Sequence, residues 1–517
     1  MEIELAGNLW WVRKFQTQEN LERITLMKKT SILEHINLGN VIAEYDANIG
    51  HYYIDTAYVY DLVNDRYDII KGVKGSGKTA MLVALCENQS IYHQLDNKIL
   101  IKAIQLKGDP DFKRAFDTVA IDNTDYQKLI DAWKIYIINL VWKEIKERKY
   151  KIDKLEKYLY NENIIAEKGG ILNSLLHSIK RVKLKASNTI NSDGSAVQSI
   201  ELSPSDTAIT IKSGRIDNLV DFNYIFDELN SLLLNNDSCL WVMLDRLDDA
   251  FPDNSERDNL ILKSLFYAYK DICFYEGFKI KIFIREDIFD NITKENGFRS
   301  LTHVNAKTMN SIKWERDTIE QLLIERLLFN DDFVEYIRSF GLETDFTKIS
   351  PDERLKIIYK FVKSQIDIGP NKPDAIGWII NHVKDGLGIY TPRDIINLFD
   401  IARNIQLNYI KEKNIIDIEE DYLISHNAIR EAYKKVSKDK LVAQLYAEYP
   451  KYRSWIESFR NGKAEHTENS LKLVLGKQWK SRIEKLKAIG FIEEKKNTWK
   501  IPFIYREALN ISQGKAK

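Results

Sequence analysis

The glycine-rich stretch from Gly72 to Thr79 constrains this chain more than any other part of its sequence. It reads GVKGSGKT and fits G-x-x-x-x-G-K-[ST], the spacing of a phosphate-binding loop. Its three glycines let the backbone curl so that successive N–H groups face one concavity. A short apolar segment, 67–70, precedes the loop, and another, 80–85, follows it. The sequence therefore predicts a buried strand, a loop and a helix whose N-terminus lies under bound phosphates.

The residue types in this loop assign roles to individual side chains. Lys78 is expected to reach the β- and γ-phosphates and is also a candidate catalytic residue, while the Thr79 hydroxyl is expected to bind Mg²⁺. ATP, or ADP, and Mg²⁺ are thus the expected ligands. The residues predicted to bind nucleotide in this stretch are Gly72, Val73, Lys74, Gly75, Ser76, Gly77, Lys78, Thr79 and Ala80.

A second motif, CLWVMLDRLDD at 239–249, predicts the acidic partner of the loop. An apolar strand ends in Asp245, and a carboxylate at that end meets a Mg²⁺ held at the loop of the neighbouring strand. Asp245 is therefore the expected second Mg²⁺ ligand. Asp248 or Asp249 could polarise the attacking water as a general base, and we favour Asp248. The alternative is that one of them only caps a turn before Pro252.

Arg285 ends a third apolar strand, 278–284. At that edge an arginine would face the γ-phosphate, where it could sense the nucleotide or stabilise charge that develops during phosphoryl transfer. The alternative is a salt bridge to Glu286 or Asp287.

Two further arginines are candidates with weaker signals. Arg393, in YTPRDIINLF, begins a helix in a region expected to form a lid, and it would contact nucleotide from there. The alternative is that Thr391 and Pro392 simply start the helix. Arg299 precedes a strand-like stretch, 304–309, and would reach a neighbouring subunit's site in a ring-forming ATPase; the alternative is a surface arginine.

The length and the pattern of segments predict several domains, because 517 residues exceed a single hydrophobic core. Strand and helix patterns alternate at first, which indicates an α/β fold with a parallel sheet and helices on both faces. Helical patterns follow. The expected domains are an N-terminal extension packed on the ATPase (1–55), a P-loop core (56–310) with a β-hairpin-like insertion (about 150–215), a helical lid (311–425) and a winged-helix-like domain (426–517).

Cysteine usage and hydropathy favour a cytoplasmic protein. Cys86, Cys239 and Cys273 have no ligand-like spacing, so they are expected to be buried thiols in a reducing compartment. The apolar runs all fall short of the roughly 20 residues that cross a bilayer. No membrane association is expected, and no metal site is suggested apart from nucleotide-bound Mg²⁺.

The C-terminal segment 431–517 is basic, with 20 Lys and Arg residues against 10 Asp and Glu. Two short helices (470–475 and 477–488), Gly490 and a hairpin (491–494 with 498–503) make up a winged-helix pattern. Its basic side chains could contact DNA phosphates. They are Lys477, Lys480, Arg482, Lys485, Lys487, Lys495 and Lys496. The alternative is a protein-docking or packing module whose lysines are only solvated.

The order of GVKGSGKT, LWVMLDRLDD, the strand ending in Arg285, YTPRDIINLF and a terminal winged helix resembles AAA+/STAND-type P-loop ATPases. Origin-recognition-type and KAP-type ATPases are examples. The chain looks more closely like a bacterial group of P-loop ATPases with a KGSGKTA loop that is often associated with phage-defence loci. The resemblance covers about 40–510. One departure is the pair Asp248-Asp249, since many relatives have Glu there.

Two functions are consistent with these features. The first is an ATP-hydrolysing AAA+/STAND-like regulatory ATPase that acts with nucleic acid, in a setting of antiviral defence, as a homo-oligomer or complex. The second is a nucleotide-gated switch with little turnover that controls an effector protein. The basic C-terminus favours the first, and the Asp-Asp pair and the insertion favour the second.

Overall fold

The computed structural model describes residues 28–105, 126–162, 164–165, 188–190, 196–198, 220–251, 256–295, 301–496 and 498–516. These residues divide into two compact units. Ala57–Val73 and Asn88–Ser311 make up the first, which we call the sheet unit. Met1–Thr56, Lys74–Glu87 and Ile312–Lys517 make up the second, the helical unit. The chain thus changes units four times: after Thr56, inside the glycine-rich loop after Val73, after Glu87 and after Ser311.

The sheet unit is built on a four-stranded sheet with the order β1-β6-β5-β2. All three strand pairs are parallel, which confirms the predicted α/β class. The strands are β1 (Ile69–Gly72), β2 (Lys98–Ile104), β5 (Cys239–Asp245) and β6 (Phe278–Arg285). Because the strands are parallel, their carboxyl ends meet at one edge. Gly72, Asp245 and Arg285 therefore all lie at that edge.

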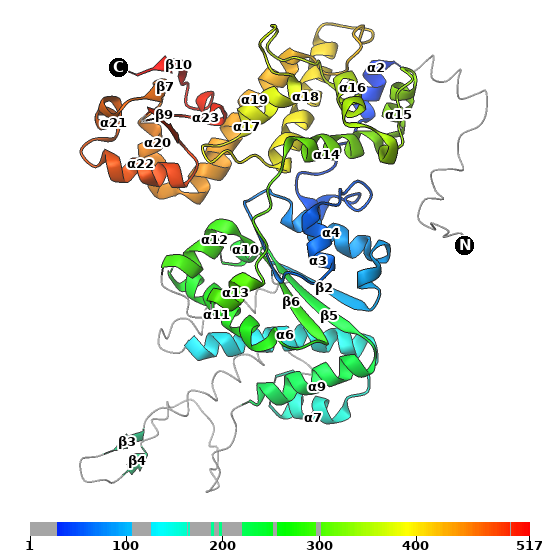
Figure 1. The fold of residues 1–517 in the computed structure, drawn as a ribbon, viewed down its shortest axis with the longest axis vertical. Coiled ribbons are helices and arrows are strands. Elements are labelled where there is room, and N and C mark those ends of the chain that lie inside the picture. The colour runs from blue at the N-terminus through cyan, green and yellow to red at the C-terminus, as the bar shows by residue number, and fades with distance from the viewer. Residues whose placement is uncertain are drawn as a thin grey trace, which may run out of the picture. The chain divides into compact units, whose positions relative to one another are not determined.

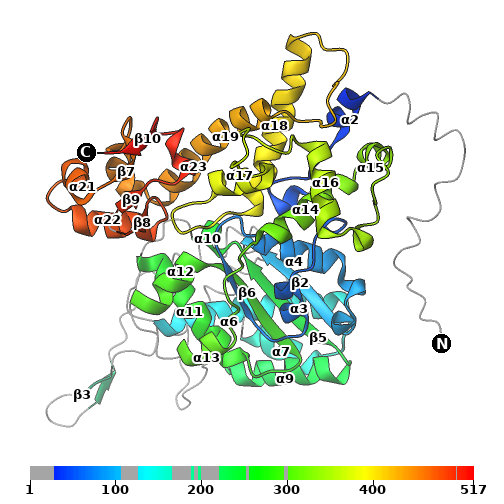
Figure 2. The ribbon, with the colours of Figure 1, turned by 45° about the horizontal axis from the view of Figure 1, so that its top comes forward.

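Helices surround this sheet (Figures 1 and 2). The longest are α6 (Tyr126–Glu147), α11 (Glu256–Ile272) and α9 (Phe222–Asn235). The shorter helical segments are α3 (Ala57–Val63), Gln89–Ile91, His93–Leu95, α7 (Asp153–Asn161), α10 (Leu247–Ala250), α12 (Glu286–Asp290), Asn291–Glu295 and α13 (Leu301–Ala306). The sequence predicts a long amphipathic helix at 126–149, and α6 agrees with it: its apolar residues recur at the helical period, and most of the helix is buried.

Alternate residues of the strands pack into one hydrophobic core with α6, α9 and α11. In β5 these are Leu240, Val242 and Leu244, which are all fully buried. Every residue of β5 is buried, as expected of a strand covered on both faces. Trp241, on the opposite face, lies under the ammonium group of Lys281, which is 4.3 Å from the ring centroid.

Lys281 is a fully buried cation in the middle of β6. Its ammonium group donates to the Asp68 carboxylate at 2.7 Å, to the Tyr67 carbonyl at 3.0 Å, and to Asp65. The Tyr269 hydroxyl donates to the other Asp68 oxygen at 2.8 Å. Burial, together with the neighbouring Asp68, raises the pKa of Tyr269 far above its ordinary range. This network fixes Asp68, the residue directly before β1, which is the strand that leads into the loop.

The helical unit shares one hydrophobic core from α2 to its last strand. Its helices are α2 (Lys29–His35), α4 (Lys78–Glu87), α14 (Arg316–Leu328), α15 (Asp331–Arg338), α16 (Pro351–Phe361), α17 (Ala375–Val383), α18 (Pro392–Glu412), α19 (His426–Asp439) and the π-helical Lys440–Tyr446. Helical turns are also formed by Ala43–Tyr45, Phe346–Lys348 and Pro450–Tyr452. The long helices confirm the predicted helical patterns after 311.

The described part of the N-terminal segment packs on these helices. Helix α2 contacts α15 and α18 (Figure 1). The Thr30 backbone N–H donates to Asp417 at 2.9 Å, and the Arg403 guanidinium donates to the Leu33 carbonyl at 2.9 Å. The turn Ala43–Tyr45 contacts α4. Residues 28–56 thus contact the helices after 311 and also the loop helix α4, which the sequence analysis assigned to the ATPase core.

The C-terminal part of the helical unit carries a small sheet with the order β10-β7-β9-β8. Its elements are α20 (Arg453–Glu457), β7 (Lys463–His466), α21 (Glu468–Leu475), α22 (Trp479–Ala488), β8 (Glu493–Lys495), β9 (Thr498–Lys500), α23 (Phe503–Arg506) and β10 (Ser512–Lys515). Strands β8 and β9 form the expected hairpin, and β7 pairs with β9. Two helices and a hairpin therefore follow one another as the pattern predicts.

Two sequence expectations differ from the structure. The strand-like stretch at 304–309 is instead helix α13 up to Ala306, followed by a single bridge between Ile69 and Thr308. In the insertion, β3 (Asn188–Ile190) pairs antiparallel with β4 (Ala196–Gln198). The sequence predicts a polar loop at 188–195 between alternating segments at 181–185 and 207–212, so the strands of this hairpin come from within and just after the expected loop. The flanking segments 181–185 and 207–212 lie outside the described residues.

Candidate nucleotide site

The carboxyl edge of the sheet brings the first residue of the predicted loop, Gly72, beside Arg285. The sequence analysis expected the strand ending in Asp245 to neighbour the strand before the loop, and this is wrong. Strand β6 lies between β1 and β5. Gly72, the first residue of the loop, is therefore paired with Arg285. Periodicity alone does not set strand order, because it identifies each strand from its own residues and not from its neighbours.

Asp245 is the last residue of β5, and the residue as a whole is 2% exposed. The chain then turns at Arg246, which has φ 54° and lies in the left-handed region. That backbone is uncommon for a residue other than glycine. The Arg246 guanidinium pairs with Asp249 three residues later. Asp249 is thus held by Arg246 within this turn, whereas Asp245 is buried at the end of the strand.

Arg285 makes the salt bridge that the alternative interpretation named, together with a second contact that it did not. Its Nε and Nη2 donate to the two Asp287 oxygens at 3.0 Å and 2.7 Å. Its Nη1 lies 3.6 Å from Asp248 Oδ2. The next residue, Glu286, accepts a hydrogen bond from the Ser311 hydroxyl at 2.8 Å. Arg285 therefore links the end of β6 to one of the two candidate bases.

In the helical unit, the rest of the loop leads into α4, which starts at Lys78. Gly75 and Gly77 have φ values of +82° and +93°, which glycine adopts without the steric cost that other residues meet. The Gly77 carbonyl accepts the Met81 N–H at 2.8 Å and so begins the helix. Lys78 is 9% exposed. These features confirm the predicted loop and helix.

The first turn of α18 lies against this loop. A Cβ built on Gly75 would be 3.1 Å from Thr391 Oγ1 and 3.2 Å from Arg393 Cβ. Thr391 caps α18 by accepting the Asp394 N–H, and Pro392 occupies the first turn. The capping role of Thr391 and Pro392 is therefore present, and the same turn places Arg393 beside the loop.

Two residues that the sequence analysis did not single out also hold the loop. The Trp314 indole N–H donates to the Ser76 carbonyl at 2.9 Å, and the Lys74 ammonium lies 3.0 Å from Glu448 Oε1. Trp314 could have been noticed, because it is an isolated aromatic residue in the polar stretch SIKWERD. Glu448 has no such signal in the sequence.

Two polar atoms at the loop fit a phosphate ligand. Ser76 is 1% exposed, and its Oγ has no hydrogen-bond partner among the described residues. The Nε atom of Arg393 is also buried and also has no hydrogen-bond partner among the described residues. Buried polar atoms without a partner cost folding free energy, so a ligand that accepts hydrogen bonds at these atoms would relieve that cost. With Lys78 and the two positive-φ glycines, this donor set suits the phosphate chain of a nucleotide.

The remaining candidate residues of the sequence analysis lie in different parts of the structure. Gly72 and Val73 lie in the sheet unit, whereas Thr79 and Ala80 lie in the first turns of α4. Arg299 lies outside the described residues. Among the described residues there is no group of three or more His, Cys, Asp or Glu side chains suited to hold a metal ion. No described helix combines the length and the apolar character needed to cross a membrane.

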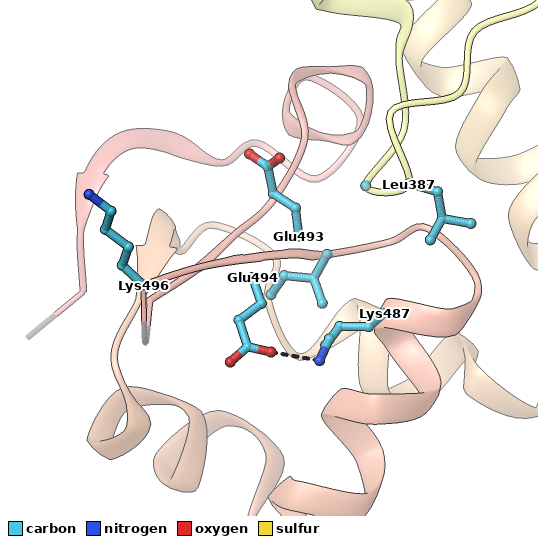
Figure 3. Close-up of a pocket in the computed structure, with 7 residues that line it drawn as sticks. Leu387, Lys487, Glu493, Glu494 and Lys496 are labelled. Carbon is cyan, nitrogen blue, oxygen red and sulfur yellow. Dashed lines mark hydrogen bonds and ion pairs between the residues drawn. The ribbon is translucent and has the colours of Figure 1, made fainter.

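The predicted basic surface of the C-terminal region is partly neutralised. Lys487 pairs with Glu484 at 3.0 Å and with Glu494 at 2.6 Å. Figure 3 shows the second pair at a shallow pocket of about 440 Å³ that Lys496 also lines. Lys495 pairs with Glu493 at 3.1 Å.

Other basic side chains of this surface lie beside aromatic rings. The Arg482 guanidinium donates to the Leu475 carbonyl at 2.9 Å and lies over Trp455. Lys480 and Lys485 lie over Trp479 and Trp455. Of the seven basic residues that the sequence analysis named on this surface, Lys477, Lys480, Lys485 and Lys496 are exposed and form no ion pair with another described residue.

The parallel sheet, with a glycine-rich phosphate loop between its β1 strand and a helix, defines a P-loop α/β core. No family model matches the chain, and no curated protein matches it.

Solved structures give several weak matches. A Walker-type ATPase of Pyrococcus abyssi is 12% identical, with 88% of this chain and 94% of that chain covered, at a TM-score of 0.38. The Aeropyrum pernix ORC2 protein, in ADPNP–ADP complexes, is 10% identical, with 90% and 97% covered, at 0.43. Drosophila ORC bound to DNA is 8% identical, with 96% and 93% covered, at 0.28. TM-scores this low do not establish a relationship.

Proposed function

We propose that this chain is an ATP-binding, Mg²⁺-dependent ATPase of the AAA+ type. The observation that carries the proposal is the glycine-rich loop GVKGSGKT at the carboxyl edge of a parallel sheet, with Arg285 paired to its first residue. The AAA+ assignment comes from the order of sequence motifs. The ATPase and ORC structures among the weak matches are consistent with it.

The side chains divide the expected work among them. The loop N–H groups and Lys78 bind the phosphate chain, and Thr79 and Asp245 are the proposed Mg²⁺ ligands. When bound, Mg²⁺ would neutralise phosphate charge. Asp248 would accept the proton of the attacking water. Arg285, which is held by Asp287 on two donors, contributes positive charge near the start of the loop.

Nucleotide binding and phosphate release by the purified full-length chain test this proposal. Lys78→Ala should abolish binding of Mg·ATP, because the loop loses its only lysine directed at the β- and γ-phosphates. Asp245→Asn should preserve nucleotide binding but remove its Mg²⁺ dependence. Thermal unfolding checks that both variants fold. Binding and turnover by Lys78→Ala at the wild-type level would refute the assignment of the site.

The alternative function is a nucleotide-gated switch with little turnover, and one observation favours it. Both candidate bases lie beside arginines, Asp249 beside Arg246 and Asp248 beside Arg285. A carboxylate whose oxygens contact a guanidinium has fewer free positions at which to accept a hydrogen bond from an attacking water. The switch predicts nucleotide that co-purifies with the protein, negligible phosphate release and a stable complex with an effector protein. Rapid multiple turnover by the isolated chain would count against it.

We further propose that the ATPase acts with nucleic acid through the exposed lysines of α22. Lys480 and Lys485 face solvent beside Trp479 and Trp455, and such mixed basic and aromatic surfaces suit nucleic acid. Lys480→Glu with Lys485→Glu should weaken DNA binding and flatten its dependence on salt. Lys487→Glu is not an equivalent change, because Lys487 is already paired with Glu484 and Glu494. If the double variant binds DNA as tightly as the wild-type chain, this proposal is refuted.

The finer assignments rest on the sequence resemblance. They are a STAND-like regulatory role, a winged-helix reader domain, assembly into a homo-oligomer or complex, and a role in antiviral defence. Mass measurement of the particle with and without ATP tests assembly. Phage plating on bacteria that express the wild-type chain or Lys78→Ala tests defence, and equal plating on both would reject that role.

A further inference from the structure

We propose that Trp314 is a positioning residue for the phosphate loop, a role that rests on the proposed nucleotide site. Its indole N–H donates to the Ser76 carbonyl at 2.9 Å. Trp314 Cζ2 lies 3.6 Å from the place where a Cβ of Gly77 would be. One side chain therefore contacts both residues of the Ser76–Gly77 peptide.

This contact fixes the direction of a phosphate-binding donor. No described peptide bond is cis, and in a trans peptide the C=O and the next N–H point in opposite directions. With the Ser76 carbonyl directed at Trp314, the Gly77 N–H points away from Trp314. In a phosphate loop the N–H groups of this stretch must face the concavity that holds the phosphates. Trp314 thus holds the peptide in the orientation that exposes the donor.

The loop needs such a restraint because its own residues do not supply it. Gly75 and Gly77 both have positive φ values, and glycine has several other conformations within reach. The Gly77 carbonyl accepts the Met81 N–H and is therefore fixed. The Ser76–Gly77 peptide, which precedes it, has no such restraint from the helix and could still rotate. Restraining it before the ligand arrives lowers the entropic cost of binding.

Trp314 itself is held rigidly. It packs on the helical core and lies two residues before α14 begins. Arg316, the first residue of that helix, donates to Glu320 at 2.7 Å and to Asp374 at 3.0 Å. Arg354 pairs with Asp317 at 2.7 Å. The indole is therefore presented by a helix start that three charged contacts fix in place.

Trp314→Phe removes the indole donor and keeps an aromatic ring, so it is the direct test. Trp378→Phe is the matched control, because the Trp378 indole also donates a hydrogen bond in the helical unit, to Asp367 at 3.0 Å. Affinities for Mg·ADP and for Mg·pyrophosphate are measured by calorimetry on the full chain. Trp314→Phe should weaken both ligands by the same factor, about fivefold to tenfold for the loss of one hydrogen bond. Trp378→Phe should leave both affinities unchanged.

A second readout separates positioning from simple packing. With 5-fluorotryptophan in the protein, the ¹⁹F resonance that disappears in Trp314→Phe should shift when pyrophosphate binds, and the Trp378 resonance should not. Wild-type affinity in Trp314→Phe, or equal losses in the two variants, would overturn the role of Trp314 while Lys78→Ala still abolishes binding. If the wild-type chain binds neither ligand, the nucleotide site itself fails, and the inference fails with it.

Discussion

Asp248 and Asp249 are adjacent, but changing each to its amide is expected to have very different effects on the rate of phosphate release. Asp249 is paired with Arg246, and their side chains are 37% and 34% exposed. An exposed pair of this kind is worth about 0–1 kcal/mol. Asp249→Asn should therefore alter phosphate release by no more than about threefold, which corresponds to less than 1 kcal/mol.

Asp248 is in a different position. Its Oδ2 lies 3.6 Å from Arg285 Nη1, while Asp287 takes the Nε and Nη2 donors of the same arginine. Asp248→Asn thus leaves Arg285 anchored and should not unfold the edge of the sheet. If Asp248 is the general base, its loss should lower turnover by about 10²- to 10⁴-fold, or roughly 3–5 kcal/mol of transition-state stabilisation.

Single-turnover phosphate release with saturating Mg·ATP measures this difference, since it separates the chemical step from product release. Binding of a fluorescent ADP analogue to both variants is the control, and it should match that of the wild-type chain. A loss of 100-fold or more in Asp249→Asn, with Asp248→Asn within threefold of wild type, would refute the assignment. Equal small effects would show that neither carboxylate acts as the base and would favour the switch.

Three other changes probe the loop and the two cores. Gly75→Ala should weaken Mg·ADP binding by about tenfold or more, since a Cβ meets Thr391 and Arg393 at a φ of +82° where other residues lose about 1–2 kcal/mol; Gly341→Ala, at φ +69° with nothing within 4 Å, should leave binding unchanged in the same calorimetric titration. Lys281→Met should lower the free energy of unfolding of the sheet unit by about 3–5 kcal/mol, because it leaves the buried Asp68 carboxylate without its cation; denaturant titration should show partial recovery in Lys281→Met with Asp68→Asn, and no recovery would contradict a charge effect. Burial raises the pKa of Asp385 to about 6, against hydrogen bonds from the Ile389 and Leu387 N–H groups, so the folded state holds this proton more tightly than the unfolded state. Stability from this group is therefore present below about pH 4 and lost as the pH rises through 6, by up to about 3 kcal/mol; Asp385→Asn should remove that slope in unfolding curves collected between pH 4 and 7, and an unchanged slope would show that Asp385 does not cause it.

The sequence predicts this fold well where local pattern and packing agree. The strand that ends in Asp245 is apolar at every position before the carboxylate, and it is buried at every position. Helix α6 shows a helical period and is buried along that period. In these segments the residue pattern itself decides which face is covered, so the bounds differ from the predicted ones by only a few residues.

The sequence predicts the structure less well where the result depends on the order of the strands in the sheet or on contacts between distant segments. Nothing in the apolar strands indicates that β6 lies between β1 and β5, since strand order depends on the path of the connections. The stretch 304–309 contains apolar residues at a spacing that suits a strand or a short helix, and packing selects helix α13. Trp314 and Glu448 lie 238 or more positions beyond the loop residues that they contact, so no local pattern could pair them with the loop.

These long-range contacts change what the loop motif implies. One of the four connections between the units runs from Ser311, whose hydroxyl donates to Glu286 next to Arg285, to Trp314, whose indole donates to the Ser76 carbonyl. Only two residues, Ile312 and Lys313, separate these two anchors. Each anchor lies within its own unit, Ser311 in the sheet unit and Trp314 in the helical unit. The glycine-rich motif names only the residues expected to bind phosphate, whereas the conformation of its Ser76–Gly77 peptide also depends on an indole that follows the sheet unit in the chain.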